Sequence, residues 1–204
     1  MPKSSKLHIE HVAQIFKTSS DIKNSIAGNE TLLNSIVAMA DTISESIVNG
    51  GKLLLCGNGG SAADAQHLAA ELLVRLRADV DRKGLPAIAL AMDTSTFTAC
   101  GNDFSYEHLY QRMVNVLGKS EDVLLGITTS GNSENINLAL RAAKDKGMTT
   151  FGFLGGTGGN ALSLCDIAFV VPSDVTARIQ ESHITAGHAL LELVENNLLQ
   201  RGFI

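Results

Sequence analysis

The chain of 204 residues has no tryptophan, three prolines and three cysteines, and aromatic residues make up only 4% of it. Cys56, Cys100 and Cys165 are widely spaced and form no C-x-x-C pair, which fits reduced thiols in the cytoplasm. The N-terminus has no apolar signal region, and no run approaches the ~18 apolar residues that span a bilayer. We therefore expect a cytoplasmic protein with no membrane partner.

An excess of positive charge is also missing. Lys and Arg number 16 against 21 Asp and Glu, so the formal net charge is −5 and predicts no nucleic-acid partner. The short basic run from Arg75 to Lys83 is interrupted by Asp79 and Asp81. We interpret this run as a solvated loop.

What the chain does contain is 19 glycines and short apolar runs that alternate with helical segments. This alternation predicts parallel strands and a sheet covered on both faces. The expected fold is α/β, a three-layer αβα sandwich with a five-stranded parallel sheet, preceded by N-terminal helices. The expected strands are residues 53–56, 87–91, 123–127, 149–154 and 167–171, and a last helix covers residues 176–199.

Residues 6–49 carry no strand signal, and their apolar residues recur at helical spacing. We expect two helices, broken near Gly28 and Asn29. The second is unusually apolar for a surface helix, which predicts packing on another subunit as well as on its own sheet. We therefore assign residues 1–50 to N-terminal helices and residues 51–204 to the sheet domain, within one structural unit.

Two glycine- and serine-rich loops follow apolar strands. The first runs from Gly57 to Ser61 and opens a helix, and the second runs from Thr128 to Ser133. Small residues let a ligand approach the backbone, and N–H groups at a helix start attract anions. Ligands of doubly wound sheets bind beyond the carboxyl ends of the strands. Two such loops together predict a sugar-phosphate site.

A dinucleotide site is the alternative, because residues 57–62 satisfy G-x-G-x-x-A. Asp93 would be its ribose-binding acid, but it lies over thirty residues beyond the loop, against a usual spacing of about twenty. The polar side chains of the following helix also disfavour this alternative.

His67 and Glu71 are one turn apart on that helix, and Gln180, His183 and His188 lie on the last helix. Histidine and carboxylate ligands suit zinc, although Gln180 precedes His188 by roughly 12 Å of helix. Gly101-Asn102-Asp103 is typical of a turn. The alternative is that, beyond a strand's carboxyl end, it presents an amide and a carboxylate to sugar hydroxyls.

Four ordered motifs, GNGGSAADAQH-x3-E, GND, GITTSGNS and TARIQE-x-H-x4-H, resemble sugar isomerase (SIS) domains, specifically the phosphoheptose isomerases. The resemblance covers nearly the whole chain. It implies interconversion of sedoheptulose 7-phosphate and D-glycero-D-manno-heptose 7-phosphate, for nucleotide-activated heptose and the lipopolysaccharide core. It further implies one zinc ion per subunit and a homotetramer with active sites at subunit interfaces.

The resemblance also assigns residues. The metal ligands that it implies are His67, Glu71, Gln180 and His188. The substrate contacts that it implies are Asn58, Gly59, Gly60, Glu71, Asn102, Asp103, Thr128, Thr129, Ser130, Ser133 and Gln180. We add Ser61, which lies in the first loop, to the expected substrate contacts. Ala177 is a departure, because some members carry Asp immediately before Arg-Ile-Gln.

An aldose–ketose conversion moves a proton between C1 and C2, most simply through a cis-enediol. We expect Glu71 to be the base and His188 its acid or acid/base partner. Whether the metal is catalytic or structural is left open by the residues. The rival interpretation is a non-enzymatic SIS-domain scaffold that binds the bacterial replication initiator, a group in which the position of His188 is not histidine.

Overall fold

The computed structural model describes residues 3–90 and 93–204. Over these residues, five strands form one parallel sheet in the order β2-β1-β3-β4-β5. The strands are β1 (Leu53–Gly57), β2 (Ala87–Ala89), β3 (Val123–Thr128), β4 (Thr149–Gly155) and β5 (Ile167–Val171). Each coincides with a predicted strand. The second ends at Ala89, with Leu90 in a turn, and Ala91 lies outside the described residues.

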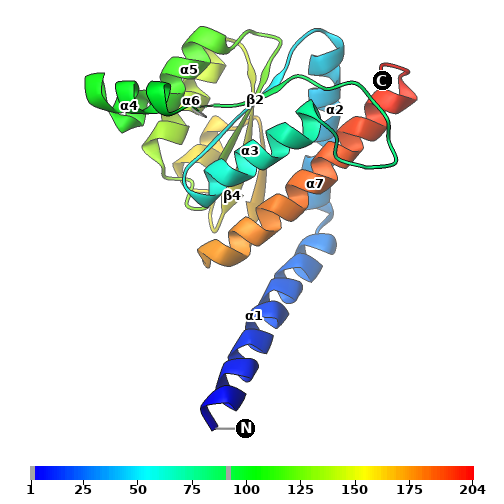
Figure 1. Ribbon diagram of the computed structural model, residues 1–204, viewed down its shortest axis with the longest axis vertical. Coiled ribbons are helices and arrows are strands. Elements are labelled where there is room, and N and C mark those ends of the chain that lie inside the picture. The colour runs from blue at the N-terminus through cyan, green and yellow to red at the C-terminus, as the bar shows by residue number, and fades with distance from the viewer. Residues whose placement is uncertain (1–2, 91–92) are drawn as a thin grey trace.

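Helices cover both faces of the sheet, so the three-layer αβα fold is confirmed (Figure 1). Along a strand, successive side chains enter different cores: Leu53 and Leu55 contact one, and Leu54 and Cys56 the other. The first core is covered by α2 (Glu30–Val48), α3 (Gly60–Leu73) and α7 (Thr176–Gln200), and the second by α4 (Thr94–Asp103), α5 (Leu109–Leu117), α6 (Glu134–Asp145) and the short η2 (Asn160–Leu164). A short 3-10 helix, η1 (Tyr106–His108), leads into α5.

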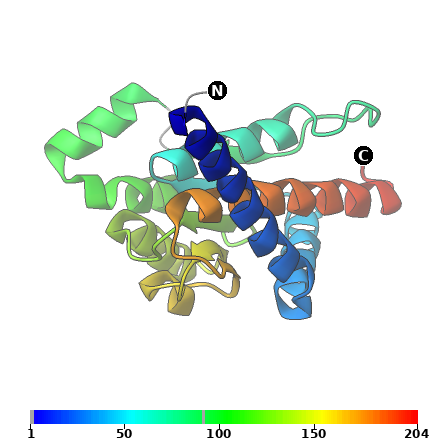
Figure 2. The same ribbon diagram turned by 90° about the horizontal axis from the view of Figure 1, so that it is seen from below.

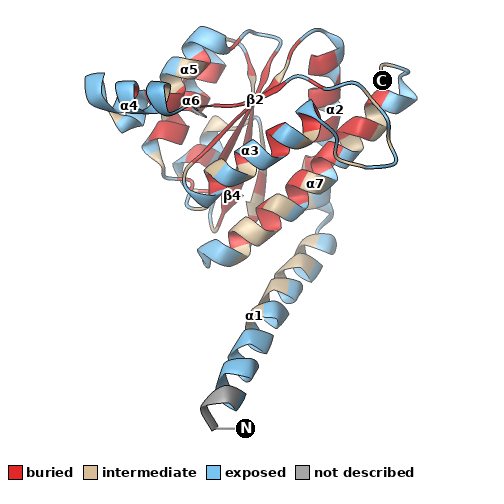
Figure 3. Ribbon diagram, viewed as in Figure 1, coloured by how far each residue is buried: buried red, intermediate tan, exposed pale blue. Residues whose placement is uncertain are grey.

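The N-terminal helices are α1 (Lys3–Ala27) and α2, and they separate at Gly28 and Asn29 as predicted. Asn29 starts α2 by accepting the Leu32 N–H with its side-chain oxygen at 3.2 Å. α1 projects away from the sheet (Figure 1) and crosses α7 in the view of Figure 2. Arg178 of α7 donates to the Ile15 carbonyl of α1. Most of α1 is exposed (Figure 3). None of the described helices is long and apolar enough to cross a membrane.

The connection between α3 and β2, residues 74–86, differs from the solvated loop that its charges predict. Arg82 is buried, with 1% of its side chain exposed, and Arg77 is exposed by 27%. Both donate to Glu195 of α7, which is also buried. The interpretation as a solvated loop is therefore wrong for these two arginines.

Candidate functional site at the carboxyl edge of the sheet

The two predicted loops lie side by side, because β1 and β3 are neighbours in the sheet. β2 lies on the far side of β1, and β4 on the far side of β3. The chain thus leaves β1 and β3 in opposite directions, which opens a crevice beyond their carboxyl ends. The first loop follows Gly57, and the second begins at Thr128.

The first loop is held in place from both sides. Asn58 and Asn135 of α6 exchange side-chain hydrogen bonds of 2.9 and 2.8 Å. Tyr106 donates its hydroxyl to the same Asn58 oxygen at 2.6 Å, and Tyr110 donates to the Gly57 carbonyl. A cavity of about 270 Å³ lies beside this loop, with both tyrosines in its wall.

Gly57 cannot be replaced in this turn without a shift of the backbone. A Cβ on Gly57 would lie 2.4 Å from the Ser61 carbonyl oxygen. Gly59 has a φ of +55°, and Gly60 starts α3. Ser61 is buried at the helix start, so backbone N–H groups and one hydroxyl lie together there.

The second loop is tied to the segment after β4. Asn132 donates its N–H to the Ser130 hydroxyl at 3.1 Å, and Asn160 donates its N–H to the Asn132 side chain at 3.1 Å. The hydroxyls of Thr128 and Ser133 are 3.3 Å apart at the start of α6. Thr129 and Ser130 line a cavity of about 230 Å³. The loop thus offers several hydroxyls next to a helix N-terminus.

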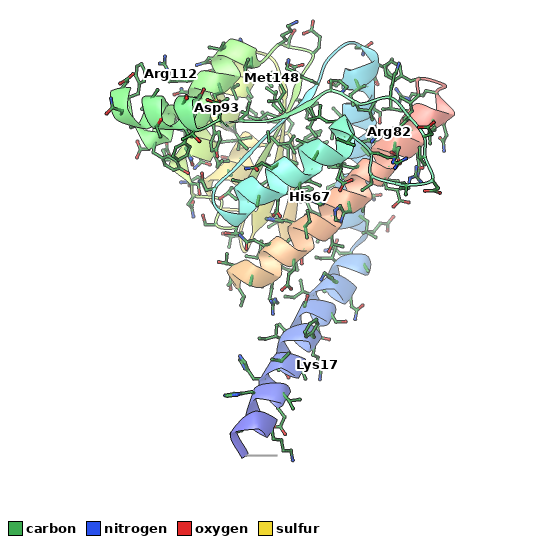
Figure 4. The ribbon with its side chains drawn as sticks, in the orientation of Figure 1. Lys17, His67, Arg82, Asp93, Arg112 and Met148 are labelled. Atoms are coloured by element: carbon green, nitrogen blue, oxygen red, sulfur yellow. The ribbon has the colours of Figure 1, made fainter. Side chains whose placement is uncertain are left out.

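The histidines of α3 and α7 meet across the two helices. His67 Nε2 lies 2.9 Å from His188 Nε2 and 3.4 Å from Glu71 Oε1. One ligand atom from each of His67, Glu71 and His188 lies within 4.8 Å of the other two. Figure 4 shows His67 on α3, with α7 alongside. Two imidazole nitrogens and a carboxylate oxygen are a donor set that zinc accepts.

A glycine explains why the two helices come so close. A Cβ on Gly187 would lie 2.7 Å from a terminal methyl group of Leu68, so a larger residue there would require Leu68 or the helices to move. Gly187 and Leu68 are the chain neighbours of His188 and His67. The close contact of the helices therefore brings the two imidazoles together.

Gln180 lies at the other end of the same helix pair. A Cβ on Gly60 would lie 2.6 Å from Gln180 Nε2, so this side chain covers the start of α3. Gln180 and His188 thus both face α3, as their spacing predicts. The amide lies against the first loop, whereas His188 contacts His67 further along the helix.

Asp64 is a residue that the sequence interpretation missed. It lies one turn before His67, and its Oδ2 is buried without a hydrogen-bond partner among the described residues. Burial raises the pKa of this carboxyl, while the nearby His67 and His188 oppose the rise. Its spacing from His67 was the available signal. Tyr106, Tyr110 and Asn135 carried none, because their roles depend on contacts far along the chain.

The other residues that the sequence singled out lie elsewhere. Asn102 and Asp103 form the exposed last turn of α4, so the interpretation of GND as a turn is wrong, and their side chains hydrogen-bond to each other at 2.8 Å. Asp93 caps α4 by accepting the Thr96 N–H at 2.7 Å. His183 is fully buried, with Nε2 2.9 Å from the Leu154 carbonyl. Ala177 is exposed in the first turn of α7.

The family model of the SIS domain matches residues 16–155 of the chain. This match covers more than half of the sequence, and the carboxyl-edge loops lie within it. The chain therefore belongs to the SIS domain family.

Within that family, the chain is similar to proteins named phosphoheptose isomerase. The relative from Clostridium acetobutylicum is 48% identical over 186 residues, which are 91% of this chain and 93% of the relative. The structure of the phosphoheptose isomerase from Neisseria gonorrhoeae is 39% identical, with a TM-score of 0.85 over 92% of this chain and 98% of that one. The structure of a phosphoheptose isomerase from Francisella tularensis is 37% identical, with a TM-score of 0.87 over 93% of this chain and 98% of that one. The predicted family resemblance is confirmed.

Proposed function

We propose that this protein is an aldose–ketose isomerase that converts sedoheptulose 7-phosphate to D-glycero-D-manno-heptose 7-phosphate. The observation that carries this proposal is the His67–Glu71–His188 cluster, which joins α3, the helix that the first loop opens, to α7. The names of the similar proteins support a heptose phosphate as the substrate class. The product would supply ADP- or GDP-heptose and lipopolysaccharide core synthesis in the cytoplasm.

The two loops are proposed to hold the sugar phosphate. Backbone N–H groups and small side chains at both helix starts suit a phosphate, and hydroxyls of the second loop add neutral donors. The proposed contacts are Asn58, Gly59, Gly60, Ser61, Thr128, Thr129, Ser130, Ser133 and Gln180. Tyr106 and Asn135 would then hold the Asn58 side chain in the orientation in which it contacts the ligand.

Glu71 and His188 are proposed as the proton-transfer groups. Glu71 takes a proton from C1 of the ketose and returns it to C2, with a cis-enediol between the two steps. His188 gives a proton to the C2 oxygen and accepts the one that leaves the C1 hydroxyl, so protons balance. Groups of this kind must lie within hydrogen-bonding distance of the reacting atoms. Glu71 and His188 both lie close to His67, so the two groups can reach neighbouring atoms of one bound sugar.

The same side chains fit one zinc ion per chain, by the chemistry of their donors. His67, Glu71 and His188 would hold it, and Gln180 is the proposed fourth ligand if its side chain turns away from Gly60. Bound zinc would polarise the carbonyl and hydroxyl oxygens of the sugar. A carboxylate has two oxygens, so Glu71 can face the ion with one and accept a proton with the other. We expect elemental analysis to find about one zinc per chain after purification without chelator.

A homotetramer with sites at subunit interfaces is also proposed. Leu7, Ile9, Val12 and Phe16 of α1 are at least half exposed, which is costly for a lone helix. An apolar groove of about 320 Å³ between α1, α2 and α7 adds further uncovered surface. Asn102 and Asp103, on the exposed end of α4, would be available to a neighbouring subunit. Light scattering should give a tetramer mass, and Phe16→Glu should lower it; a monomer mass for the parent chain would refute the proposal.

The isomerase is tested by incubating the protein with sedoheptulose 7-phosphate in D2O and following the sugar by NMR. We expect an aldoheptose phosphate that carries deuterium at C2, because a proton held by Glu71 exchanges with solvent. His188→Gln should fold and still bind sugar phosphate, with turnover reduced about 10²-fold or more. His8→Gln, on the exposed face of α1, is the matched control.

No turnover by the parent chain, with sugar phosphate still bound, would overturn the isomerase in favour of a binding protein. The non-enzymatic scaffold is that alternative, and binding of the replication initiator would then be measured. The presence of both His188 and Glu71, together with relatives named as isomerases, supports the enzyme.

A further inference from the structure

The connection that follows α3 is fixed by the buried Glu195 carboxylate and two guanidinium groups, of which Arg82 is buried and Arg77 is 27% exposed. Arg82 Nε donates to Glu195 Oε1 at 2.6 Å, and Arg77 Nε donates to Glu195 Oε2 at 2.6 Å. Arg82 and Glu195 each have only 1% of the side chain exposed. Burying charges is costly, so such a cluster persists where its hydrogen bonds are well satisfied.

Three further N–H groups of Arg82 donate to backbone carbonyls at or near the end of α3, the helix that carries His67 and Glu71. Its Nη2 donates to the Glu71 carbonyl at 2.8 Å, and its Nη1 donates to the Leu72 carbonyl at 2.9 Å and to the Lys83 carbonyl at 3.1 Å. Four of the five guanidinium N–H groups are thereby used. α3 ends at Leu73, where the last carbonyls have no donors within the helix. Arg82 supplies donors for the Glu71 and Leu72 carbonyls, and the Leu85 N–H also donates to Leu72.

Glu195 connects this helix end to α7. It follows His188 by seven residues, or roughly 10 Å along the helix. The two helices that hold the His67–Glu71–His188 cluster are therefore joined on one side by the Gly187–Leu68 contact and on the other by Arg82 and Glu195. In Figure 4, Arg82 lies toward the C-terminal ends of α3 and α7, beyond His67.

We propose that Arg82 is a positioning residue for Glu71, and that Glu195 is its anchor. Glu71 lies in the last turn of α3, where helices fray unless their carbonyls are satisfied. Arg82 holds the backbone of that residue while its positive charge complements the negative end of the helix dipole. Catalytic side chains lose rate when they are displaced by even about 1 Å, so the effect should appear in turnover. The role of Glu71 rests on the proposed function.

Arg77 provides a matched control within the same cluster. It donates to the same Glu195 carboxylate and to the Asn196 side chain, and among the described residues it donates to no carbonyl of α3. A lysine at either position keeps the charge and loses the planar fork. Arg82→Lys and Arg77→Lys therefore both weaken the cluster, while only the first releases the Glu71 carbonyl.

The test compares these two variants with the parent protein by three measurements. They are kcat and KM for sedoheptulose 7-phosphate, zinc affinity in competition with a chromophoric chelator, and hydrogen exchange of the amides in the last turn of α3. For Arg82→Lys we expect a fall in kcat of about 10-fold or more with KM changed less than threefold, weaker zinc binding and faster exchange. For Arg77→Lys we expect kcat within about twofold of the parent, even where the two variants lose similar Tm.

Equal losses of kcat in both variants, or unchanged exchange in Arg82→Lys, would overturn the proposal and leave the cluster a purely stabilising one. If Arg82→Lys does not fold, the double variant Arg82→Met with Glu195→Met takes its place, because apolar side chains of similar size can replace buried ion pairs. The same criteria apply to it. A parent protein that does not isomerise the sugar would refute the proposed function, and hydrogen exchange would still decide whether Arg82 orders the residue.

Discussion

Acidification should destabilise this fold through His183, which lies in the core between α7 and β4. The ring is fully buried, and its Nε2 lies 2.9 Å from the Leu154 carbonyl, so the neutral ring donates from Nε2. Among the described residues, Nδ1 has no hydrogen-bond partner. A second proton would thus place an unpaired cation in an apolar core. Burial accordingly lowers the pKa of His183 to about 4.

The unfolded chain gives this imidazole its ordinary pKa near 6.5, so the unfolded state binds the proton first as the pH falls. The contribution of neutral His183 is complete above pH 6.5 and is lost as the pH falls from there toward 4. A separation of about 2.5 units corresponds to roughly 3 kcal/mol in total, of which about 2 kcal/mol is lost by pH 5. Below pH 4 this loss is constant.

Urea unfolding at pH 7.5, 6 and 5 measures this effect, with chelator present so that His67 and His188 carry no metal. His183→Gln is the reference, because its amide can still donate to the Leu154 carbonyl. We expect the parent chain to lose about 2 kcal/mol more than this variant between pH 7.5 and 5. The depressed pKa values of Asp93 and Asp166 affect both proteins alike. Parallel pH profiles for the two proteins would refute the reasoning.

Two further substitutions test the loops and the helix contact. Ser130→Ala should raise the KM, because it removes a hydrogen bond to a charged group that contributes about 1–3 kcal/mol of binding free energy. Ser61→Ala should raise the KM less, because backbone N–H groups persist. An unchanged KM in both variants would mean that the phosphate binds elsewhere. Gly187→Ala should force α3 and α7 apart, since its Cβ would lie 2.7 Å from Leu68, and should lower the free energy of unfolding by about 1–3 kcal/mol together with zinc affinity. Denaturant unfolding and chelator competition measure these two effects, and a variant as stable as the parent would show that the helices repack.

The sheet could be predicted because its signals are local. Each strand is a short apolar run, and each loop follows directly from its strand, so the carboxyl edge and both glycine-rich turns could be located from the sequence. The break between α1 and α2 was equally local, since Asn29 caps the helix that begins at the next residue. Such features depend on neighbours a few residues away.

The parts that could not be predicted depend on distant contacts. Arg82 lies among charged residues, and its burial results from Glu195, 113 residues further along the chain. Tyr106 supports Asn58 over a separation of 48 residues. Asn102 and Asp103 are common turn residues, yet they lie in a helix that Asp93 caps nine residues earlier. Composition within a short window cannot report these partners.

The His67–His188 contact also determines when the protein can acquire its site. The two imidazoles are 121 residues apart in the chain and meet only where α3 packs against α7. During synthesis at about 5–20 residues per second, several seconds pass between the appearance of the first histidine and the second. A nascent chain with α3 already formed therefore presents one imidazole and one carboxylate, a weak ligand pair. The complete set of donors arises only when α7 docks, so the zinc binding proposed above would follow the packing of α7 on α3.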